Sequence, residues 1–237
     1  MTRTERFRHT LVVILTFGTG AVDAVGFLHL GGAFSSVMTG NMVLLGLSAP
    51  GGDWARTILV GIAIAGYIAG VVCGAHLAGR ASATDRVWPA RVTTALAVEG
   101  GLLVALSVVW LLTGPTRGDS LDEVMLAMSS LALGIQSSAV QRFGVSGLSS
   151  TYLTGTLTTV VAGFAARRAF RLQVPGLLIL VALVVGAAAG FAVSAVAPVF
   201  VPVVLVGPIA FVVCAALLIA WDDDRILARP SSRPRAG

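Results

Sequence analysis

Residues 20–46 read GAVDAVGFLHLGGAFSSVMTGNMVLLG, and residues 134–157 carry a second version of the same pattern, GIQSSAVQRFGVSGLSSTYLTGTL. A constant offset of 115 aligns polar and small residues of the two copies: Ser36 with Thr151, Thr39 with Thr154 and Gly40 with Gly155. In each copy an apolar helix with a glycine and a polar side chain leads into a glycine- and serine-rich break. Thr-Gly and another apolar run follow. The pattern therefore predicts a helix, a break and a half-helix, twice in one chain.

The composition places these breaks in a membrane. Hydrophobic residues make up 56% of the chain, charged residues 11%, and the mean hydropathy is +0.92. A water-soluble domain carries about 25% charged residues, so this chain has too few charges to cover a soluble surface. The basic excess of 16 over 11 consists entirely of arginine, which in a membrane protein marks cytoplasmic loops. We expect the lipid bilayer as a partner and no nucleic acid.

Eight apolar segments follow one another along the chain, at residues 11–29, 33–49, 54–79, 92–113, 124–140, 148–166, 174–195 and 200–221. The second and the sixth are short and contain the breaks, whereas the others reach the roughly 18 residues that span a bilayer core. The polar ends, 1–10 and 222–237, are expected to be cytoplasmic tails, the second of them disordered. We predict a single transmembrane domain over residues 11–221, with one repeat at 11–113 and the other at 121–221.

Small residues at intervals of four support the repeat, because each series follows its own Thr-Gly motif: Gly66, Gly70 and Gly74, then Gly186, Gly190 and Ser194. Such ridges let two membrane helices approach closely. They could join the two halves of one chain, and they could also join copies of the chain in a homo-oligomer.

The arginine distribution favours six full spans over eight. If all eight segments cross the membrane, 12 arginines lie on the cytoplasmic side and 4 outside. If the two broken segments enter and leave by the same face, the counts become 14 and 2. We therefore predict an all-α integral membrane protein of about six transmembrane helices plus two broken, re-entrant half-helices. Both termini are then cytoplasmic, and the halves form inverted repeats, as in many secondary transporters.

Several motifs together resemble the YoaK-like family, a domain of unknown function in small bacterial membrane proteins: Gly20-Ala-Val-Asp23-Ala, Leu30-Gly-Gly-Ala-Phe34, Met38-Thr39-Gly40-Asn41, Gly134-Ile-Gln136 and Leu153-Thr154-Gly155-Thr156-Leu157. The resemblance covers nearly the whole chain. It implies about six spans in the bacterial cytoplasmic (inner) membrane and no established substrate. Ser137 departs from the family pattern, in which an amide residue is expected after the glutamine.

The half-helix starts, Thr39-Gly40-Asn41 and Thr154-Gly155-Thr156, are the first candidate site. In inverted halves, two positive helix ends would meet near the midplane together with Ser36 and Thr151, a suitable place for an anion or a carboxylate. The alternative is structural: Thr39 and Thr154 only cap the half-helices, and the glycines allow close packing.

Asp23 is the strongest single candidate for a functional residue. It lies twelve residues past Leu11, roughly 18 Å along a helix, where an ionised carboxylate is costly unless it is paired or hydrated. It could bind a proton or cation, or it could cap the neighbouring half-helix, and both roles can hold together. Gln136, its approximate counterpart in the second copy, cannot titrate.

Glu99, Gln141 and Arg142 are secondary candidates. Glu99 could be a second coupling carboxylate or a structural partner of Arg142 near the inner face. No metal-binding motif, phosphate-binding loop or nucleophile elbow occurs in the sequence, so we expect no metal, no cofactor and no enzymatic activity.

Taken together, these features favour a secondary transporter or channel that moves a small polar solute or anion across the cytoplasmic membrane, with proton coupling as an option. The alternative is a membrane sensor or assembly partner without transport. An intramembrane enzyme is the weakest hypothesis.

Overall fold

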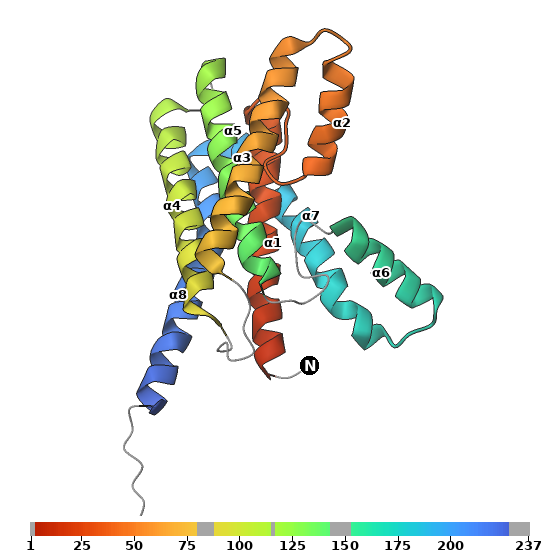
Figure 1. Ribbon diagram of the computed structural model, residues 1–237, viewed down its shortest axis with the longest axis vertical. Helices are drawn as coiled ribbons and strands as arrows, with labels where there is room; N and C mark the ends of the chain where they lie inside the picture. The colour runs from red at the N-terminus through yellow and green to blue at the C-terminus, as the bar shows by residue number, and fades with distance from the viewer. Residues whose placement is uncertain (1–2, 80–87, 115–116, 143–152, 228–237) are drawn as a thin grey trace, which may run out of the picture.

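The computed structural model describes residues 3–79, 88–114, 117–142 and 153–227, and these residues form α-helices joined by short connections (Figure 1). The helices are α1 (Arg3–His29), α2 (Met38–Ser48), α3 (Trp54–Ala78), α4 (Ala90–Thr113), α5 (Asp119–Gln141), α6 (Leu153–Ala165), α7 (Phe170–Val196) and α8 (Val201–Leu227). A 3₁₀ turn at Pro198–Phe200 precedes α8.

Six of these helices are long and apolar enough to cross a membrane: α1, α3, α4, α5, α7 and α8. The other two are shorter, with 11 residues in α2 and 13 in α6. At 1.5 Å per residue they measure about 17 and 20 Å, well below the roughly 30 Å of a hydrocarbon core. The prediction of an all-α membrane protein with six long helices and two half-helices is therefore confirmed.

The two half-helices lie in opposite halves of the bundle. Figure 1 shows α1 rising from the lower end, α2 confined to the upper half, and α3 descending beside α2. It also shows α5 descending, α6 confined to the lower half and α7 rising beside α6. The first described residues and the end of α8 both lie at the lower end.

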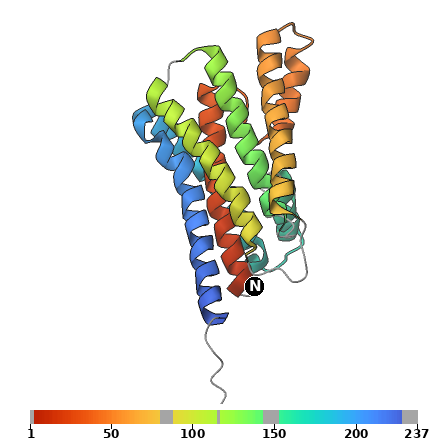
Figure 2. The ribbon, with the colours of Figure 1, turned by 60° about the vertical axis from the view of Figure 1, so that its left-hand side comes forward.

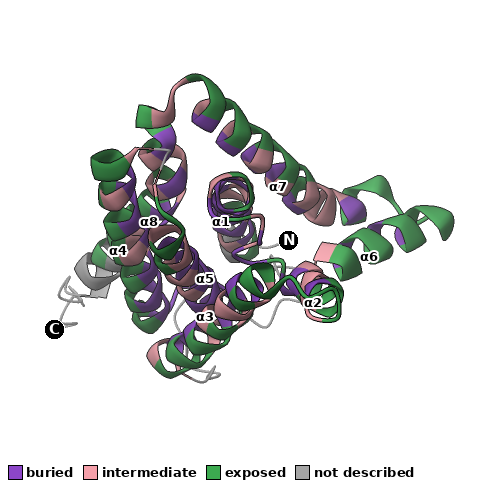
Figure 3. Cartoon of the chain, turned by 90° about the horizontal axis from the view of Figure 1, so that it is seen from above, coloured by how far each residue is buried: buried purple, intermediate pink, exposed green. Residues whose placement is uncertain are grey.

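Helix α1 lies at the centre of the bundle. Seen from above, it is enclosed by α5, α7 and α8, and the exposed residues lie on the outer faces of the surrounding helices (Figure 3). Figure 2 shows the side of the bundle where α8 runs beside α4. Many of the exposed residues are large and apolar, whereas Asp23, Glu99 and Gln136 are buried. This arrangement suits a bilayer, in which the outer side chains meet lipid.

The small-residue ridges lie inside the chain. A Cβ atom on Gly70 would lie 2.9 Å from the carbonyl carbon of Leu131 on α5, and one on Gly186 would lie 2.7 Å from that of Phe17 on α1. Real Cβ atoms do not approach so closely, so only glycine allows these backbones to meet. The ridges thus hold α3 on α5 and α7 on α1, and a homo-oligomer would have to use other faces.

Glycines also end two of the spans. Gly79 after α3 and Gly114 after α4 have φ values of +68° and +71°, a conformation that is costly for residues with a Cβ. Each donates its backbone N–H to a carbonyl of the last helical turn.

Both chain ends are more helical than expected. Helix α1 begins at Arg3, within the segment predicted as a polar tail, and α8 continues to Leu227, within the segment predicted as disordered. Polar residues do not stop a helix once it has left the hydrocarbon, because water can solvate their side chains. The prediction of a disordered tail from residue 222 is therefore wrong for residues 222–227.

Candidate functional site

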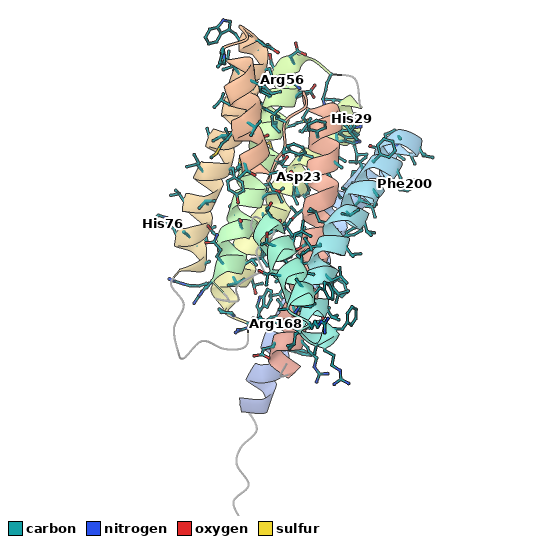
Figure 4. The ribbon with its side chains drawn as sticks, turned by 90° about the vertical axis from the view of Figure 1, so that its right-hand side faces the viewer. Asp23, His29, Arg56, His76, Arg168 and Phe200 are labelled. Carbon is teal, nitrogen blue, oxygen red and sulfur yellow. The ribbon has the colours of Figure 1, made fainter. Side chains whose placement is uncertain are left out.

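The Asp23 carboxylate binds the break between α1 and α2. Its Oδ1 accepts the backbone N–H groups of Ser35 and Ser36, both at 2.8 Å, and its Oδ2 accepts the Ser36 hydroxyl at 2.5 Å. Asp23 is 6% exposed and lies near mid-height of the bundle (Figure 4). Bonds from N–H and O–H groups to a carboxylate are among the stronger hydrogen bonds. Asp23 therefore has the structural role that the sequence left open, as an acceptor for the break before α2.

Asn41 fixes the same break from the other side. Its Oδ1 accepts the N–H of Phe34 at 2.9 Å, and its Nδ2 donates to the carbonyl of Phe34 at 2.7 Å. The side chain is fully buried, so this pair satisfies two backbone groups that would otherwise be costly at this depth. The Ser35 and Ser129 hydroxyl oxygens lie 2.7 Å apart and link the break to α5.

The Thr-Gly motifs do not face inward as expected. The N-cap of α2 is Val37 and makes no side-chain cap bond, while Thr39 is exposed on the outer face of the helix. Met38 and Asn41, three residues apart, take the buried face. The prediction that Thr39 caps α2 is therefore wrong. Neither Thr39 nor Gly40 lines the cleft beside Asp23, and Gly40 is half-buried.

The second copy behaves similarly where it is described. Thr154 and Gly155 are exposed, and Thr156 is buried, its methyl carbon close to Gly176 of α7. Thr151 lies outside the described residues. The first turn of α6 therefore places one of its three predicted site residues, Thr156, in the interior.

A second polar cluster joins three transmembrane helices: Thr19 on α1, Glu99 on α4 and Gln136 on α5. Gln136 Nε2 donates to Glu99 Oε1 at 2.8 Å, and Thr19 Oγ1 donates to Gln136 Oε1 at 2.7 Å. All three side chains are buried, Glu99 completely. Thr19 was not among the site residues predicted from the sequence, because a threonine on an apolar helix usually bonds only its own backbone.

Glu99 does not pair with Arg142 as the structural alternative predicted. The Arg142 guanidinium donates to the carbonyl of Ala78 at the end of α3, whereas Glu99 takes Gln136 as its partner. Gln141 is exposed at the end of α5. Neither Gln141 nor Arg142 belongs to the buried cluster of Thr19, Glu99 and Gln136.

Gln136 is not the structural counterpart of Asp23. Gly20 and Gly134 make matching close approaches, to α7 and α3 respectively, so Asp23, three residues after Gly20, corresponds to Ser137. The Ser137 hydroxyl accepts the Tyr67 hydroxyl at 2.9 Å. The position at which the family pattern is broken thus faces α3 as part of the α3–α5 packing.

Two hollows lie beside the two carboxylates. A cleft of about 300 Å³ lies next to Asp23 between α1, α7 and the break, and is lined by Gly20, Asp23, Ala24, Phe27, Leu28, Phe34, Val37, Leu183 and Ala187. The Phe27 and Phe34 rings stack there with centroids 4.7 Å apart. A cavity of about 10 Å³ lies beside Glu99 and Gln136. The larger hollow reaches the lower end of the volume range of small-molecule sites.

In the described part of the chain, no three His, Cys, Asp or Glu side chains gather closely enough to hold a metal ion.

Six long apolar helices, two half-helices and buried carboxylates at membrane depth define a polytopic α-helical membrane protein. The chain belongs to the family described as "Protein of unknown function (DUF1275)", whose model matches residues 11–219. It is 36% identical to the UPF0700 transmembrane protein YoaK of Bacillus subtilis (strain 168) over 168 residues. The aligned part makes up 70% of this chain and 72% of that protein. No solved structure matches it. The resemblance to the YoaK-like family is confirmed.

Proposed function

We propose that this protein is a secondary transporter of a small polar solute in the bacterial cytoplasmic membrane. The observation that carries the proposal is the cleft of about 300 Å³ beside the buried carboxylate of Asp23. A buried ionisable side chain at membrane depth most often marks a substrate or ion pathway. A break in the helix at the same depth is tolerated where it lines a cavity.

The transporter proposal includes two inverted repeats. Helix α1 rises where α5 descends, and α2 and α6 lie in opposite halves of the bundle (Figure 1). The packing also corresponds, because α3 lies on α5 as α7 lies on α1. Inverted repeats with binding sites at interrupted helices are typical of secondary transporters, in which one part of the molecule rocks against another.

Within this proposal, the single carboxylate of an otherwise apolar cleft would suit a neutral or cationic solute better than an anion. Its lining includes one carboxylate and no arginine or histidine. The N–H groups of Ser35 and Ser36, which could have received an anion, are already bonded to Asp23. An anion in the cleft would meet a like charge in a medium of low dielectric constant, where repulsion is strong.

We further propose that the lower end of the bundle, with both chain ends, faces the cytoplasm. Arg56 lies toward the opposite end (Figure 4), and Arg117, just before the start of α5, is neutralised by Asp122 at 2.6 Å. Arg91 in the first turn of α4 and Arg168 (Figure 4) then lie on the cytoplasmic side, in agreement with the positive-inside rule.

The decisive experiment is solute exchange in proteoliposomes. Small polar metabolites and cations would first be screened by thermal shift, because a ligand that binds the native state raises its apparent stability. Counterflow of a radiolabelled hit would then be measured with Ala24→Leu, which fills the cleft, and with Ala188→Leu, an exposed position on α7, as the matched control. We expect Ala24→Leu to abolish exchange and Ala188→Leu to retain it. Ligand binding without exchange in the unaltered protein would favour the sensor hypothesis instead.

A further inference from the structure

The Thr19 hydroxyl has two acceptors and one proton. Its Oγ1 lies 3.1 Å from the carbonyl oxygen of Leu15 and 2.7 Å from Oε1 of Gln136. A hydroxyl group donates a single hydrogen bond, so it cannot serve both acceptors fully at once. The two bonds therefore correspond to two arrangements of the same cluster.

In the first arrangement Glu99 is ionised. The Gln136 amide nitrogen donates to Glu99 Oε1, and the amide oxygen accepts the hydroxyl proton of Thr19. The carbonyl of Leu15 then receives nothing from the Thr19 side chain.

In the second arrangement Glu99 carries a proton, which it donates to the Gln136 amide oxygen. The amide has turned by 180°, so its nitrogen now donates to Thr19 Oγ1, and the Thr19 hydroxyl donates to Leu15. Because the nitrogen and oxygen of an amide have almost the same size, the turn leaves the heavy atoms in place. The 2.8, 2.7 and 3.1 Å separations suit both arrangements.

The surroundings of Glu99 are compatible with both the ionised and the protonated carboxyl group. Its Oε2 has no hydrogen-bond partner within the described residues, and the adjoining cavity of about 10 Å³ approaches the volume that one water needs. The cavity takes side chains from α1, α4, α5 and α8, and apart from Glu99 and Gln136 they are apolar or glycine.

Among the described residues, no charged or titratable group other than Glu99 lines this cavity. The other described titratable side chains of the helices packed around Glu99 lie outside the cavity: Glu5, Arg6, Arg8, His9, Asp23 and His29 of α1, Arg56, Tyr67, Cys73 and His76 of α3, Arg91 of α4, Asp119, Asp122 and Glu123 of α5, and Cys214 of α8. An isolated buried carboxylate is costly, whereas its protonated form is not.

We propose that Glu99 is a buried proton-binding site whose protonation turns the Gln136 amide and the Thr19 hydroxyl. Only one proton is transferred from one heavy atom to another: it moves from solvent to an oxygen of the Glu99 carboxylate. The Gln136 and Thr19 protons move only by rotation of their groups. A proton bound on α4 thereby changes the hydrogen bond that α5 makes to α1. The site itself does not require transport; its role as the coupling site rests on the proposed function and would make the proton the coupling ion.

Infrared spectroscopy of the full chain in lipid tests this site without any solute. The chain has three glutamates, Glu5, Glu99 and Glu123, so ¹³C-glutamate labelling in a Glu5→Gln/Glu123→Gln background isolates Glu99 unaltered. We expect its carboxylic acid band to give way to a carboxylate band as pH rises. The side-chain amide band of Gln136, identified by its loss in Gln136→Leu, should shift at the same midpoint.

The contribution of Thr19 has a matched control one turn earlier. Thr16 is equally buried, and its hydroxyl donates to the carbonyl of Val12 at 2.8 Å, whereas the hydroxyl that Gln136 accepts is that of Thr19. Thr19→Val should move the shared midpoint by up to about one pH unit, in line with the loss of one hydrogen bond, and Thr16→Val should leave it in place.

Two results would overturn the proposal. A Glu99 signal that stays constant over the pH range in which the protein remains folded would exclude the proton site. A Glu99 signal that titrates while the Gln136 band stays constant would exclude the linked rotation. Neither result would bear on solute exchange through the Asp23 cleft, so failure of this site and failure of the proposed transport are distinguishable.

Discussion

Gly20 and Gly134 make the same approach to two different helices. A Cβ on Gly20 would lie 2.9 Å from the backbone nitrogen of Ala187 on α7, and a Cβ on Gly134 would lie 2.9 Å from that of Val71 on α3. Two helix pairs, α1 with α7 and α5 with α3, are thus closed by glycine at equivalent places.

The first prediction concerns this packing. Gly70→Ala should lower the apparent melting temperature, because the new methyl would meet the α5 backbone and force the helices apart, at a cost of about 1–3 kcal/mol. Gly61→Ala on the same helix is the control, since nothing lies within 4 Å of its Cβ position. It should be neutral or stabilise by up to about 1 kcal/mol through helix propensity. Equal destabilisation by both variants would show that the glycine contacts do not hold α3 on α5.

The second prediction concerns the break. Asp23→Ala should destabilise the protein by at least about 2 kcal/mol, because it leaves the buried N–H groups of Ser35 and Ser36 without their acceptor. Asp23→Asn should be milder, because its amide oxygen can still accept both groups and its nitrogen can donate to the Ser36 hydroxyl. Thermal unfolding in detergent, followed by intrinsic fluorescence or scattering, measures both. Equal melting temperatures for Asp23→Ala and the unaltered protein would contradict the capping role.

The third prediction concerns orientation. Single cysteines at Ser120 and Ala169, both exposed and at opposite ends of the bundle, would be placed in a chain lacking Cys73 and Cys214. An impermeant thiol reagent applied to intact cells should label position 120 and spare position 169, and membrane disruption should make both reactive. Labelling of position 169 from outside would reverse the proposed orientation.

The fourth prediction concerns coupling. In proteoliposomes, Glu99→Gln should abolish solute uptake driven by a pH gradient while retaining solute exchange, because the amide keeps the volume and the bond to Gln136 but binds no proton. Glu123→Gln at the start of α5 is the matched control and should behave like the unaltered protein. If Glu99→Gln accumulates solute with unchanged pH dependence, Glu99 is not the coupling residue, whatever its infrared signal.

The sequence predicted the break well because its determinants are local. Asp23 lies 12 and 13 residues before Ser35 and Ser36, so one helix end and one short loop bring them together. Six spans followed from length and charge alone. Thr39 was expected on the inner face of α2, but it is exposed. The buried face of a half-helix of only 11 residues is hard to predict, because so few positions define it. Helix α2 begins at Met38, and because Met38 and Asn41 occupy its buried face, Thr39 points outward.

The Thr19–Gln136–Glu99 cluster could not be predicted as a unit. Its bonds join residues 117 and 37 positions apart in sequence, and no periodicity or motif links them. Which face of α4 meets α5 depends on side-chain packing across three helices, and that information is spread over the whole chain. Glu99 stood out by its charge, but its partner could be chosen only once the helices were in place.

The glycine contacts have a mechanical consequence. Backbones packed this closely cannot slide without opening voids, so α1 with α7 and α3 with α5 behave as two stiff blocks. The His9–Pro175 bond lies within the first block and the Tyr67–Ser137 and Ser138–Val71 bonds within the second. The Thr19–Gln136 bond joins the two blocks directly, and the Ser35–Ser129 bond joins the loop after α1 to the second block. Any rocking of one block against the other would have to break these two hydrogen bonds.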